Sequence, residues 1–288
     1  MYGIVILNYN SYLLTCNLVK KLVDFNKVGK IVIVDNNSND DFSEFIKSMN
    51  CKKLIYIKSK KNSGYAAGNN IGLRYLYNHG YEYAFIANPD VEFAENTTDQ
   101  IYNFLLKNDN YAVASCKRTI GKNGRTGQFW NLPNYWDCLI ESVYSGRKWL
   151  DSKYKNNFDI VWSDTTSLYY DVEVVGGAFF GCNLNAINEI GYLNEHTFLW
   201  YEENILAFNL KKNGYKESLL LKCSYEHNHI RKRHGNNKHG IYLHSKRVYC
   251  YECLRINIAK KMLLSIFDFI GYFESKLIYI IASLIKSN

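Results

Sequence analysis

The chain has few prolines and no long uncharged apolar stretch. Only two of its 288 residues are proline. A membrane-spanning helix needs about 20 apolar residues with few or no charges. The apolar stretch from Met262 to Ile285 instead carries Asp268, Glu274 and Lys276. The N-terminus lacks the basic and apolar regions of a signal peptide, because a strand pattern begins at once. These absences predict a cytoplasmic protein without a spanning C-terminal helix.

Several binding motifs are absent as well. The glycine-rich segment 62–72 has neither the GxGxxG spacing nor the P-loop Gly-Lys-Ser/Thr, which argues against dinucleotide-binding and P-loop proteins. Among eight cysteines the one close pair is Cys250 and Cys253, with no second pair at zinc-site spacing, so we expect reduced, mostly buried thiols. The net charge of +8 favours anionic partners, but no nucleic-acid motif is recognised, so nucleic acid is not a predicted partner.

What is present is a regular alternation of apolar runs and helical patterns. The length fits one large domain. Strands are predicted at residues 3–7, 30–34, 54–57, 83–87 and 111–116, and helices at 11–25, 68–78, 97–107 and 202–213, with Ser11 as a helix cap. This order indicates βαβ units, and therefore an α/β fold with a parallel sheet covered by helices on both faces. From Ile241 the pattern is helical to the end.

A polar turn follows the strand at residues 83–87. Pro89 fixes its own φ and holds Asn88 in an extended conformation, so the strand should end abruptly and present Asp90 at its carboxyl edge. Ligands bind at that edge in open α/β sheets. A carboxylate there suits a hard cation such as Mg²⁺, shared with substrate phosphates. The alternative is a surface turn that contains an aspartate.

Two further loops carry candidate nucleotide contacts. Asp35 follows a buried strand, where an acidic side chain can accept hydrogen bonds from a base or ribose. The alternative for Asp35 is an Asx turn or helix cap. In the segment 62–72, glycines at a helix start allow backbone N–H groups to approach a phosphate.

Candidate catalytic residues come later in the chain. Glu202 and Glu203 fall in the first turn of a predicted helix, directly after apolar and aromatic residues. A carboxylate with a raised pKa in such a place suits a general base, whereas the alternative is stabilisation of the helix dipole. The glycines of the segment Gly176-Gly177-Ala178 indicate close backbone approach to a ligand or to another strand.

Histidines follow a further strand, which the sequence predicts at Glu217 to Cys223. His227 and His229 are spaced by two on an extended segment, so both side chains face the same side and are candidates for one metal ion or phosphate. The alternative is a solvated basic loop.

Together these segments, from about residue 3 to residue 230, resemble the family 2 glycosyltransferases, especially the bacterial enzymes that build capsule, O-antigen or rhamnose-containing glycans. Each motif is modest alone, but their order along the chain is specific. The matching segments are Val34-Asp35-Asn36-Asn37-Ser38, Asn62 to Gly72, Asn88-Pro89-Asp90, Gly176-Gly177-Ala178, Tyr201-Glu202-Glu203 and His227.

The resemblance implies a role for individual residues. It implies that Glu203 is the catalytic base and that Asp90 and His227 face a Mg²⁺ or Mn²⁺ ion. The implied nucleotide contacts are Asn8, Asp35, Asn37, Asn62, Gly64, Gly68, Asn69 and Asn88. The implied acceptor-side residues are Gly177, Ala178, Trp200 and Glu202.

Three positions depart from the family pattern. Asn88 replaces the first carboxylate of the Asp-x-Asp metal motif, which leaves Asp90. Glu203 replaces an aspartate base and is one methylene longer. Ile205 replaces a further aspartate, so an acceptor contact from that position is lost. The resemblance implies a GT-A fold, with a Rossmann-like nucleotide-binding sheet between helices, and inversion of configuration at the sugar.

The expected organisation is a catalytic domain over residues 1–240 and a C-terminal helical region over residues 241–288. Residues 1–116 form the expected nucleotide-binding half, and residues 117–240 the acceptor-binding half. The expected function is metal-dependent inverting transfer of a sugar from a UDP- or dTDP-linked donor to a glycan or lipid-linked acceptor, in bacterial surface polysaccharide synthesis. The expected localisation is cytoplasmic. The sequence does not decide between a monomer and a homodimer.

Two alternatives share this fold. One is a non-catalytic protein that binds sugar nucleotides, because fold does not determine function. The other is a sugar-1-phosphate nucleotidyltransferase. That enzyme would need an N-terminal glycine-rich loop followed by Arg and Lys, and the segment Asn8-Tyr9-Asn10-Ser11 is not such a loop.

The C-terminal region has helical apolar spacing. One stripe is predicted from Leu263, Ile266, Phe267, Ile270, Phe273, Leu277, Ile281 and Leu284. The nearby lysines that could meet anionic headgroups are Lys260, Lys261, Lys276 and Lys286. The stripe and these lysines together predict a peripheral contact with the inner face of the cell membrane. The alternative is that the stripe packs on the catalytic domain or on a second subunit.

Overall fold

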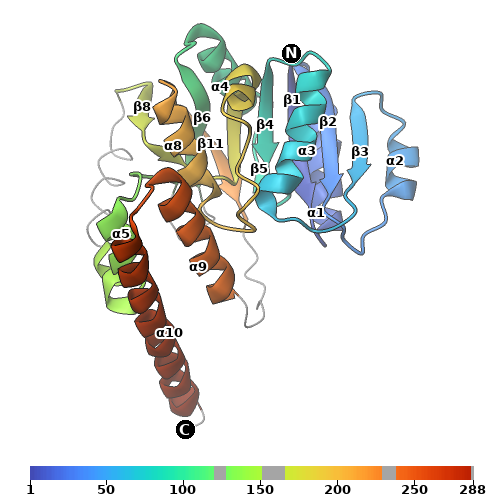
Figure 1. The fold of residues 1–288 in the computed structure, drawn as a ribbon. Helices are drawn as coiled ribbons and strands as arrows, with labels where there is room; N and C mark the ends of the chain where they lie inside the picture. The colour runs from blue at the N-terminus through green and yellow to red at the C-terminus, as the bar shows by residue number, and fades with distance from the viewer. Residues whose placement is uncertain (120–127, 151–165, 229–237, 287–288) are drawn as a thin grey trace.

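A computed structural model describes residues 1–119, 128–150, 166–228 and 238–286 (Figure 1). His229 and the basic residues 231–233 fall outside these ranges.

A mixed sheet of nine strands organises the described residues. The strand order is β3 (Leu54–Lys58), β2 (Val28–Asp35), β1 (Tyr2–Asn8), β4 (Tyr83–Ala87), β10 (Phe179–Asn183), β6 (Tyr111–Thr119), β11 (Lys216–His227) and β5 (Val91–Glu92), with β8 (Tyr169–Val172) also paired to β11. The strands from β3 to β4 are parallel to one another, as predicted. The sheet as a whole is mixed, because β10, which the βαβ pattern did not include, runs antiparallel between β4 and β6.

Gly181 explains how β10 fits between its neighbours. A Cβ atom at Gly181 would lie 2.7 Å from Ile101 and 2.9 Å from Phe85. The absence of a side chain at Gly181 therefore allows β10 to pack closely beside Phe85 and Ile101 in the centre of the sheet. One sheet thus joins the two expected halves of the catalytic domain.

Helices cover both faces of this sheet (Figure 1). Alternate residues of β1 explain the two layers: Ile4 and Ile6 pack with residues of α1 (Tyr12–Leu22), α2 (Ser43–Met49) and α4 (Glu95–Lys107). Val5, pointing the other way, packs with residues of α3 (Tyr65–Asn78), α7 (Leu184–Glu189) and α8 (Glu202–Lys212). A small second sheet pairs β7 (Phe129–Trp130) with β9 (Val174–Val175), and α5 (Tyr135–Ile140) follows β7.

Two helix starts differ from their predictions. α1 begins at Tyr12, but the Ser11 side chain makes no capping bond; its hydroxyl donates to the Tyr9 carbonyl. α3 begins at Tyr65 rather than at Gly68, after Gly64 with φ of 94°. Gly68 lies in the second turn, where a Cβ atom would come 2.4 Å from Leu7. Gly68 therefore allows close packing of α3 on β1 and is not at the helix start.

The C-terminal region is helical but not continuous. α9 (Lys238–Val248) passes into a π-helix (Tyr249–Cys253), and α10 (Ile258–Lys286) begins after a break. The region from Ile241 is thus helical, as predicted, apart from this break at residues 254–257. Cys250 and Cys253 are buried within the π-helix. In Figure 1, α10 starts beside α5 and extends well beyond the sheet.

α10 is fastened to the rest of the chain by a buried ion pair. The Lys246 ammonium donates to Asp268 Oδ1 and to the Ser142 hydroxyl, each at 2.6 Å, and both charged side chains are almost fully buried. Arg247 Nε donates to Asp268 Oδ2 at 2.9 Å. Asp268, which the sequence placed beside an apolar stripe, therefore anchors the helix.

Candidate active site

Three of the expected site segments meet at Gly177 and Ala178. The backbone N–H of Asn88, at the end of β4, donates to the Ala178 carbonyl at 2.9 Å. The Tyr65 hydroxyl, at the start of α3, donates to the Gly177 carbonyl. The Gly177 N–H donates to Glu203 Oε1 at 3.1 Å. Gly177 and Ala178 therefore connect the turn at Asn88, the start of α3 at Tyr65 and the candidate base Glu203.

Glu203 lies in the first turn of α8 because the chain turns sharply before it. Trp200 and Tyr201 have φ of 71° and 66°, a left-handed conformation that non-glycine residues rarely adopt. Burial raises the pKa of Glu203, although hydrogen bonds from its own N–H and the Gly177 N–H oppose the rise. The side chain keeps some exposure. A partly accessible carboxylate with a raised pKa suits proton abstraction at neutral pH.

Glu202 lies under this surface. Its side chain is 2% exposed, and within the described residues its Oε1 makes no hydrogen bond. Burial first, and the charge of Glu203 second, raise its pKa well above the usual range. The structure thus places Glu202 below the site, where it offers no surface to an acceptor. Trp200 is half-buried and packs edge-on against Tyr242, with ring centroids 6.0 Å apart.

Glu217 is a buried acid that the sequence did not single out. It lies on β11, is 4% exposed, and accepts a hydrogen bond from the Val175 N–H at 2.7 Å. Burial raises its pKa well above the usual range, and the charge of Glu203 adds to the rise. Glu217 therefore holds the backbone two residues before Gly177. The sequence placed Glu217 only at the start of a strand, since its bond to Val175 depends on the tertiary fold.

Tyr65 was also missed. Burial, followed by the charges of Glu203 and Glu202, raises its pKa well above the usual range, so the hydroxyl stays protonated and donates to Gly177. Asn69, one turn later, donates from Nδ2 to the Tyr65 carbonyl at 3.0 Å. Its buried Oδ1 has no hydrogen-bond partner within the described residues. Asn69 is thus a polar group near the start of α3 with unused bonding capacity.

The two expected metal ligands come together. β5 pairs with β11 so that Val91 lies opposite His227. This pairing brings His227 Nε2 to 3.3 Å from Asp90 Oδ1, with both side chains mostly buried. The Asn228 N–H also donates to the Asp90 carbonyl at 2.9 Å. The prediction that Asp90 and His227 are neighbours agrees with this geometry.

The Asp90–His227 pair fits part of a divalent metal site. A carboxylate oxygen and an imidazole nitrogen are suitable ligands for Mn²⁺, and the carboxylate also suits Mg²⁺. Within the described part of the chain, no group of three His, Cys, Asp or Glu side chains is arranged to hold a metal. For Mg²⁺ in general, substrate phosphates and water usually complete the coordination.

Asp35 is fully buried and already bonded within the chain. Its Oδ1 accepts from the Ser38 N–H at 2.9 Å and from the Ser38 hydroxyl at 2.6 Å. Its Oδ2 accepts from the Tyr56 hydroxyl at 3.1 Å and lies 3.6 Å from the Lys58 ammonium. The Asx turn considered as an alternative is therefore present. A nucleotide contact from this carboxylate would have to share or displace these bonds.

Asn8 and Asn37 belong to the same loop cluster. The Asn8 side chain is buried, donating to Ser38 and Asp40 and accepting from Thr15. Asn37 is exposed at the loop tip with φ of 60°, which asparagine tolerates. Asn8 thus shapes the nucleotide-side loop from below, whereas Asn37 faces outward.

The glycine-rich loop joins the nucleotide side to the acceptor side. The Asn36 amide donates to Asn62 Oδ1 at 2.9 Å and to the Gly64 carbonyl at 3.0 Å. The Tyr65 N–H donates to the Phe198 carbonyl at 2.9 Å, and a Cβ atom at Gly64 would lie 2.4 Å from that oxygen. Gly64 is therefore needed both for its positive φ and for this close approach.

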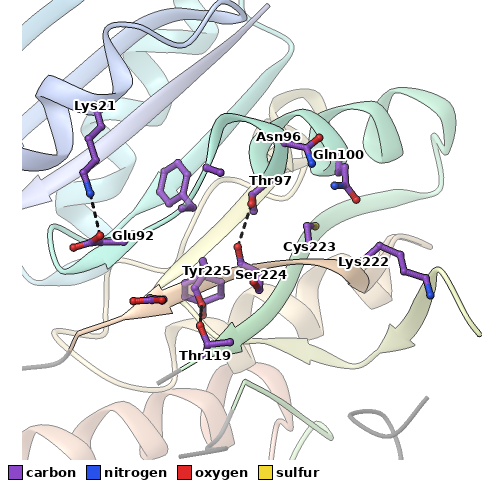
Figure 2. Close-up of a pocket in the computed structure, with 13 residues that line it drawn as sticks. Lys21, Glu92, Asn96, Thr97, Gln100, Thr119, Lys222, Cys223, Ser224 and Tyr225 are labelled. Atoms are coloured by element: carbon purple, nitrogen blue, oxygen red, sulfur yellow. Dashed lines mark hydrogen bonds and ion pairs between the residues drawn. The ribbon is translucent and has the colours of Figure 1, made fainter. Parts of the chain in front are cut away.

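A separate pocket of about 480 Å³ is lined mainly by residues of β5, α4 and β11. Figure 2 shows Lys21 reaching Glu92 and Thr97 reaching the backbone of Ser224 across it; the measured distances are 3.0 and 3.1 Å. Its lining contains none of the expected site residues. The pocket is therefore distinct from the Gly177 cluster.

Comparison with known proteins identifies the family. The model of glycosyl transferase family 2 matches residues 3–166, more than half of the chain. The chain is 27% identical over 213 residues to the low-salt glycan biosynthesis hexosyltransferase Agl10 of Haloferax volcanii, covering 74% of this chain and 62% of that protein. The chain thus spans less than two thirds of this curated relative.

Solved structures share the fold. GalNAc-T7 with UDP, GalNAc and Mn²⁺ has a TM-score of 0.61 at 14% identity, over 83% of this chain and 45% of that one. S. aureus TarS 1–349 in complex with UDP-GlcNAc has a TM-score of 0.60 at 15% identity, over 92% and 71%. The strand order and the likeness to these structures define a fold of the GT-A class. The chain belongs to glycosyl transferase family 2, which confirms the resemblance.

Proposed function

We propose that the chain is an inverting glycosyltransferase in which Glu203 is the general base. The observation that carries the proposal is the hydrogen bond from the Gly177 N–H to Glu203 Oε1. It holds a carboxylate of raised pKa at the point where three site segments meet. Inverting transfer needs one base that deprotonates the acceptor hydroxyl, in line with the departing nucleoside diphosphate.

In this proposal the donor lies along the carboxyl ends of β1, β2 and β4. The Asp35 loop and the Asn62–Gly64 loop contact the nucleotide and orient the sugar, which supplies the alignment that transfer needs. Asn88 and Asn69 are further contacts on the nucleotide side. A UDP- or dTDP-linked sugar is the proposed donor, and the UDP-GlcNAc bound by TarS is in keeping with a nucleoside diphosphate.

Asp90 and His227 would hold a Mg²⁺ or Mn²⁺ ion. Such an ion supplies electrostatic stabilisation of the negative charge on the leaving diphosphate. The Mn²⁺ ion in the GalNAc-T7 structure supports a metal in this fold. The protein's part is to place one carboxylate and one imidazole side by side at the end of β4.

The proposed acceptor is a glycan or lipid-linked sugar, approaching over Gly177, Ala178 and Trp200. The hexosyltransferase activity in the name of Agl10 supports hexose transfer. We place the reaction in the cytoplasm, in surface polysaccharide synthesis, with residues 1–240 as the catalytic domain.

A thermal-shift screen against UDP- and dTDP-sugars, with and without Mn²⁺, tests donor binding. Release of nucleoside diphosphate from the stabilising donor then separates the enzyme from a non-catalytic sugar-nucleotide-binding protein. A nucleotidyltransferase would instead release pyrophosphate from a nucleoside triphosphate and a sugar 1-phosphate. The proposal fails if sugar nucleotides stabilise the protein but no nucleoside diphosphate is released with any acceptor mixture.

A further inference from the structure

α10 has two faces of different character. Its docked face contains Leu264, Asp268 and Gly271, which are all buried. A Cβ atom at Gly271 would lie 1.8 Å from the Ser142 carbonyl oxygen, so the helix backbone rests directly on the segment that follows α5. Glu274 accepts a hydrogen bond from the Tyr144 N–H at 2.6 Å on the same side. This face is therefore occupied by the protein itself.

The opposite side, here called the outer face, is apolar and open. At 100° per residue its members centre on the side of the helix opposite Leu264 and Asp268. Each is between 49% and 64% exposed: Met262, Ile266, Phe269, Ile270, Phe273 and Leu277. The single stripe predicted from sequence is therefore divided. Leu263 and Phe267 pack against the apolar core formed by α5, α8 and the π-helix, whereas Ile266, Ile270, Phe273 and Leu277 face outward. Ile281 and Leu284 lie where side chains are not described.

The outer face contains no carboxylate among residues 258–278. Both acidic residues of α10 belong to the docked side, where Asp268 pairs with Lys246 and Arg247, and Glu274 bonds to Tyr144. Lys276, by contrast, is exposed and lies over the Tyr272 ring. Lys148, exposed over the Tyr144 ring, adds a cation on the adjoining segment.

Exposed aromatic side chains are also found on the segments next to α10. Trp136 and Trp149 are 59% and 52% exposed, on the segments that α10 packs against. Trp and Tyr are enriched at membrane–water interfaces, because an apolar ring is combined with a polar group. No helix of the described chain is long and apolar enough to cross a membrane.

We propose that the outer face of α10 docks on a bilayer surface that contains anionic phospholipid, with the helix lying in the interfacial plane. An interfacial helix needs an apolar face together with cations for the headgroups, and α10 has both. The chemistry argues against a second copy as the occupant. A twofold contact would pair this face with itself, and the described part of the face has no carboxylate to pair with Lys276 of the other copy. The net charge of +8 acts in the same direction.

Vesicle sedimentation with the full chain tests this surface without any sugar donor, so its outcome is independent of the proposed transferase reaction. The two probes are phosphatidylcholine vesicles and vesicles with added phosphatidylglycerol. The chain should bind the anionic vesicles more tightly, and binding should weaken as salt is raised. The double variant Phe269→Ala/Phe273→Ala should lower the partition coefficient by about a hundredfold.

A matched control removes equally exposed apolar side chains elsewhere. Leu13 on α1 and Leu106 on α4 are 73% and 48% exposed. Leu13→Ala/Leu106→Ala should leave vesicle binding unchanged. Lys148→Gln/Lys276→Gln should weaken binding to the anionic vesicles by about tenfold and leave binding to phosphatidylcholine unchanged.

Three results would overturn the proposal. Equal binding to both kinds of vesicle would remove the anionic headgroup as the ligand. Equal loss of binding in the control and the phenylalanine variant would remove the outer face. A lipid-free dimer that Phe269→Ala/Phe273→Ala dissociates, with no vesicle binding by the parent chain, would make this face an interface between copies.

Discussion

The Gly177 N–H donates a hydrogen bond to Glu203 Oε1 at 3.1 Å, although 26 residues separate them. A side chain at Gly177 would displace the carboxylate, since a Cβ atom there would lie 2.5 Å from the same oxygen. A backbone N–H stabilises the ionised form of the carboxylate, whereas burial favours the neutral form. Both the position of the Glu203 carboxylate and the stability of its ionised form therefore depend on Gly177.

Glu203→Gln should lower the rate of transfer by about a hundredfold to ten-thousandfold, because an amide cannot take the proton from the hydroxyl group of the acceptor substrate. Donor binding, measured by thermal shift, should be retained. Glu202→Gln is the matched control: the change is the same, but it lies on a buried side chain and should cost far less activity. Near parent-level transfer by Glu203→Gln would remove Glu203 from the mechanism.

The pH dependence of kcat/KM reports the same group. Burial raises the pKa of Glu203, and a base acts only when it is deprotonated. Activity should therefore fall as the pH drops through this raised pKa, at a higher pH than for an ordinary glutamate. A profile that stays flat down to the usual glutamate range would contradict this assignment.

Gly177→Ala should lower kcat by about a hundredfold, since a displacement of roughly 1 Å at a reacting group has that effect. The new methyl group would push Glu203 aside, while the donor loops are unchanged, so KM for the donor should stay similar. Gly29→Ala is a matched control on β2, where a Cβ atom would lie 2.6 Å from the flexible Tyr81 hydroxyl. That control should keep its activity. A parallel loss of kcat in both variants would indicate general destabilisation.

Asp90→Asn should weaken Mn²⁺-dependent nucleotide binding by about tenfold or more, because the pair with His227 loses its carboxylate charge. The measurement is the nucleotide-induced thermal shift with and without Mn²⁺. Asp109→Asn, an exposed aspartate away from this turn, is the control. If a chelator leaves both nucleotide binding and transfer by the parent chain intact, Asp90 does not act through a metal.

Glu217→Gln should change the pH dependence of stability. Because burial raises the pKa of Glu217 in the folded state, its contribution to stability is fully present below the unfolded pKa. That contribution is lost as the pH rises toward the folded pKa, by about 1.4 kcal/mol for each pH unit between the two pKa values. Urea unfolding at a series of pH values should show a smaller decline for the variant.

Glu226→Gln provides the control for Glu217, since it is exposed on the same strand. The stability of Glu226→Gln should decline with rising pH as that of the parent chain does. Parallel curves for the parent chain and Glu217→Gln would show that Glu217 titrates in the folded state much as it does in the unfolded chain.

Local sequence determined where the elements form and what stands at their ends. Continuous apolar runs predicted β1 to β4 and β6, because strands covered on both faces need apolar residues on both sides. Pro89 determined the turn that presents Asp90. Gly214, with φ of 84°, follows the end of α8, where glycine commonly ends a helix. The resemblance to family 2 implied that Asp90 and His227 face one metal ion, and His227 Nε2 lies 3.3 Å from Asp90 Oδ1.

Only the tertiary structure decided the rest, because each remaining feature depends on a partner far away in the chain. The sequence around residue 181 does not indicate that β10 runs antiparallel between β4 and β6. Glu217 becomes a buried acid only when β11 meets Val175, and Tyr65 a site residue only when α3 meets Gly177. Helical spacing placed apolar residues on α10, but the docking of Asp268 and Gly271 decided which of them face outward. Periodicity specifies a helix and its apolar positions, whereas packing decides which positions are covered.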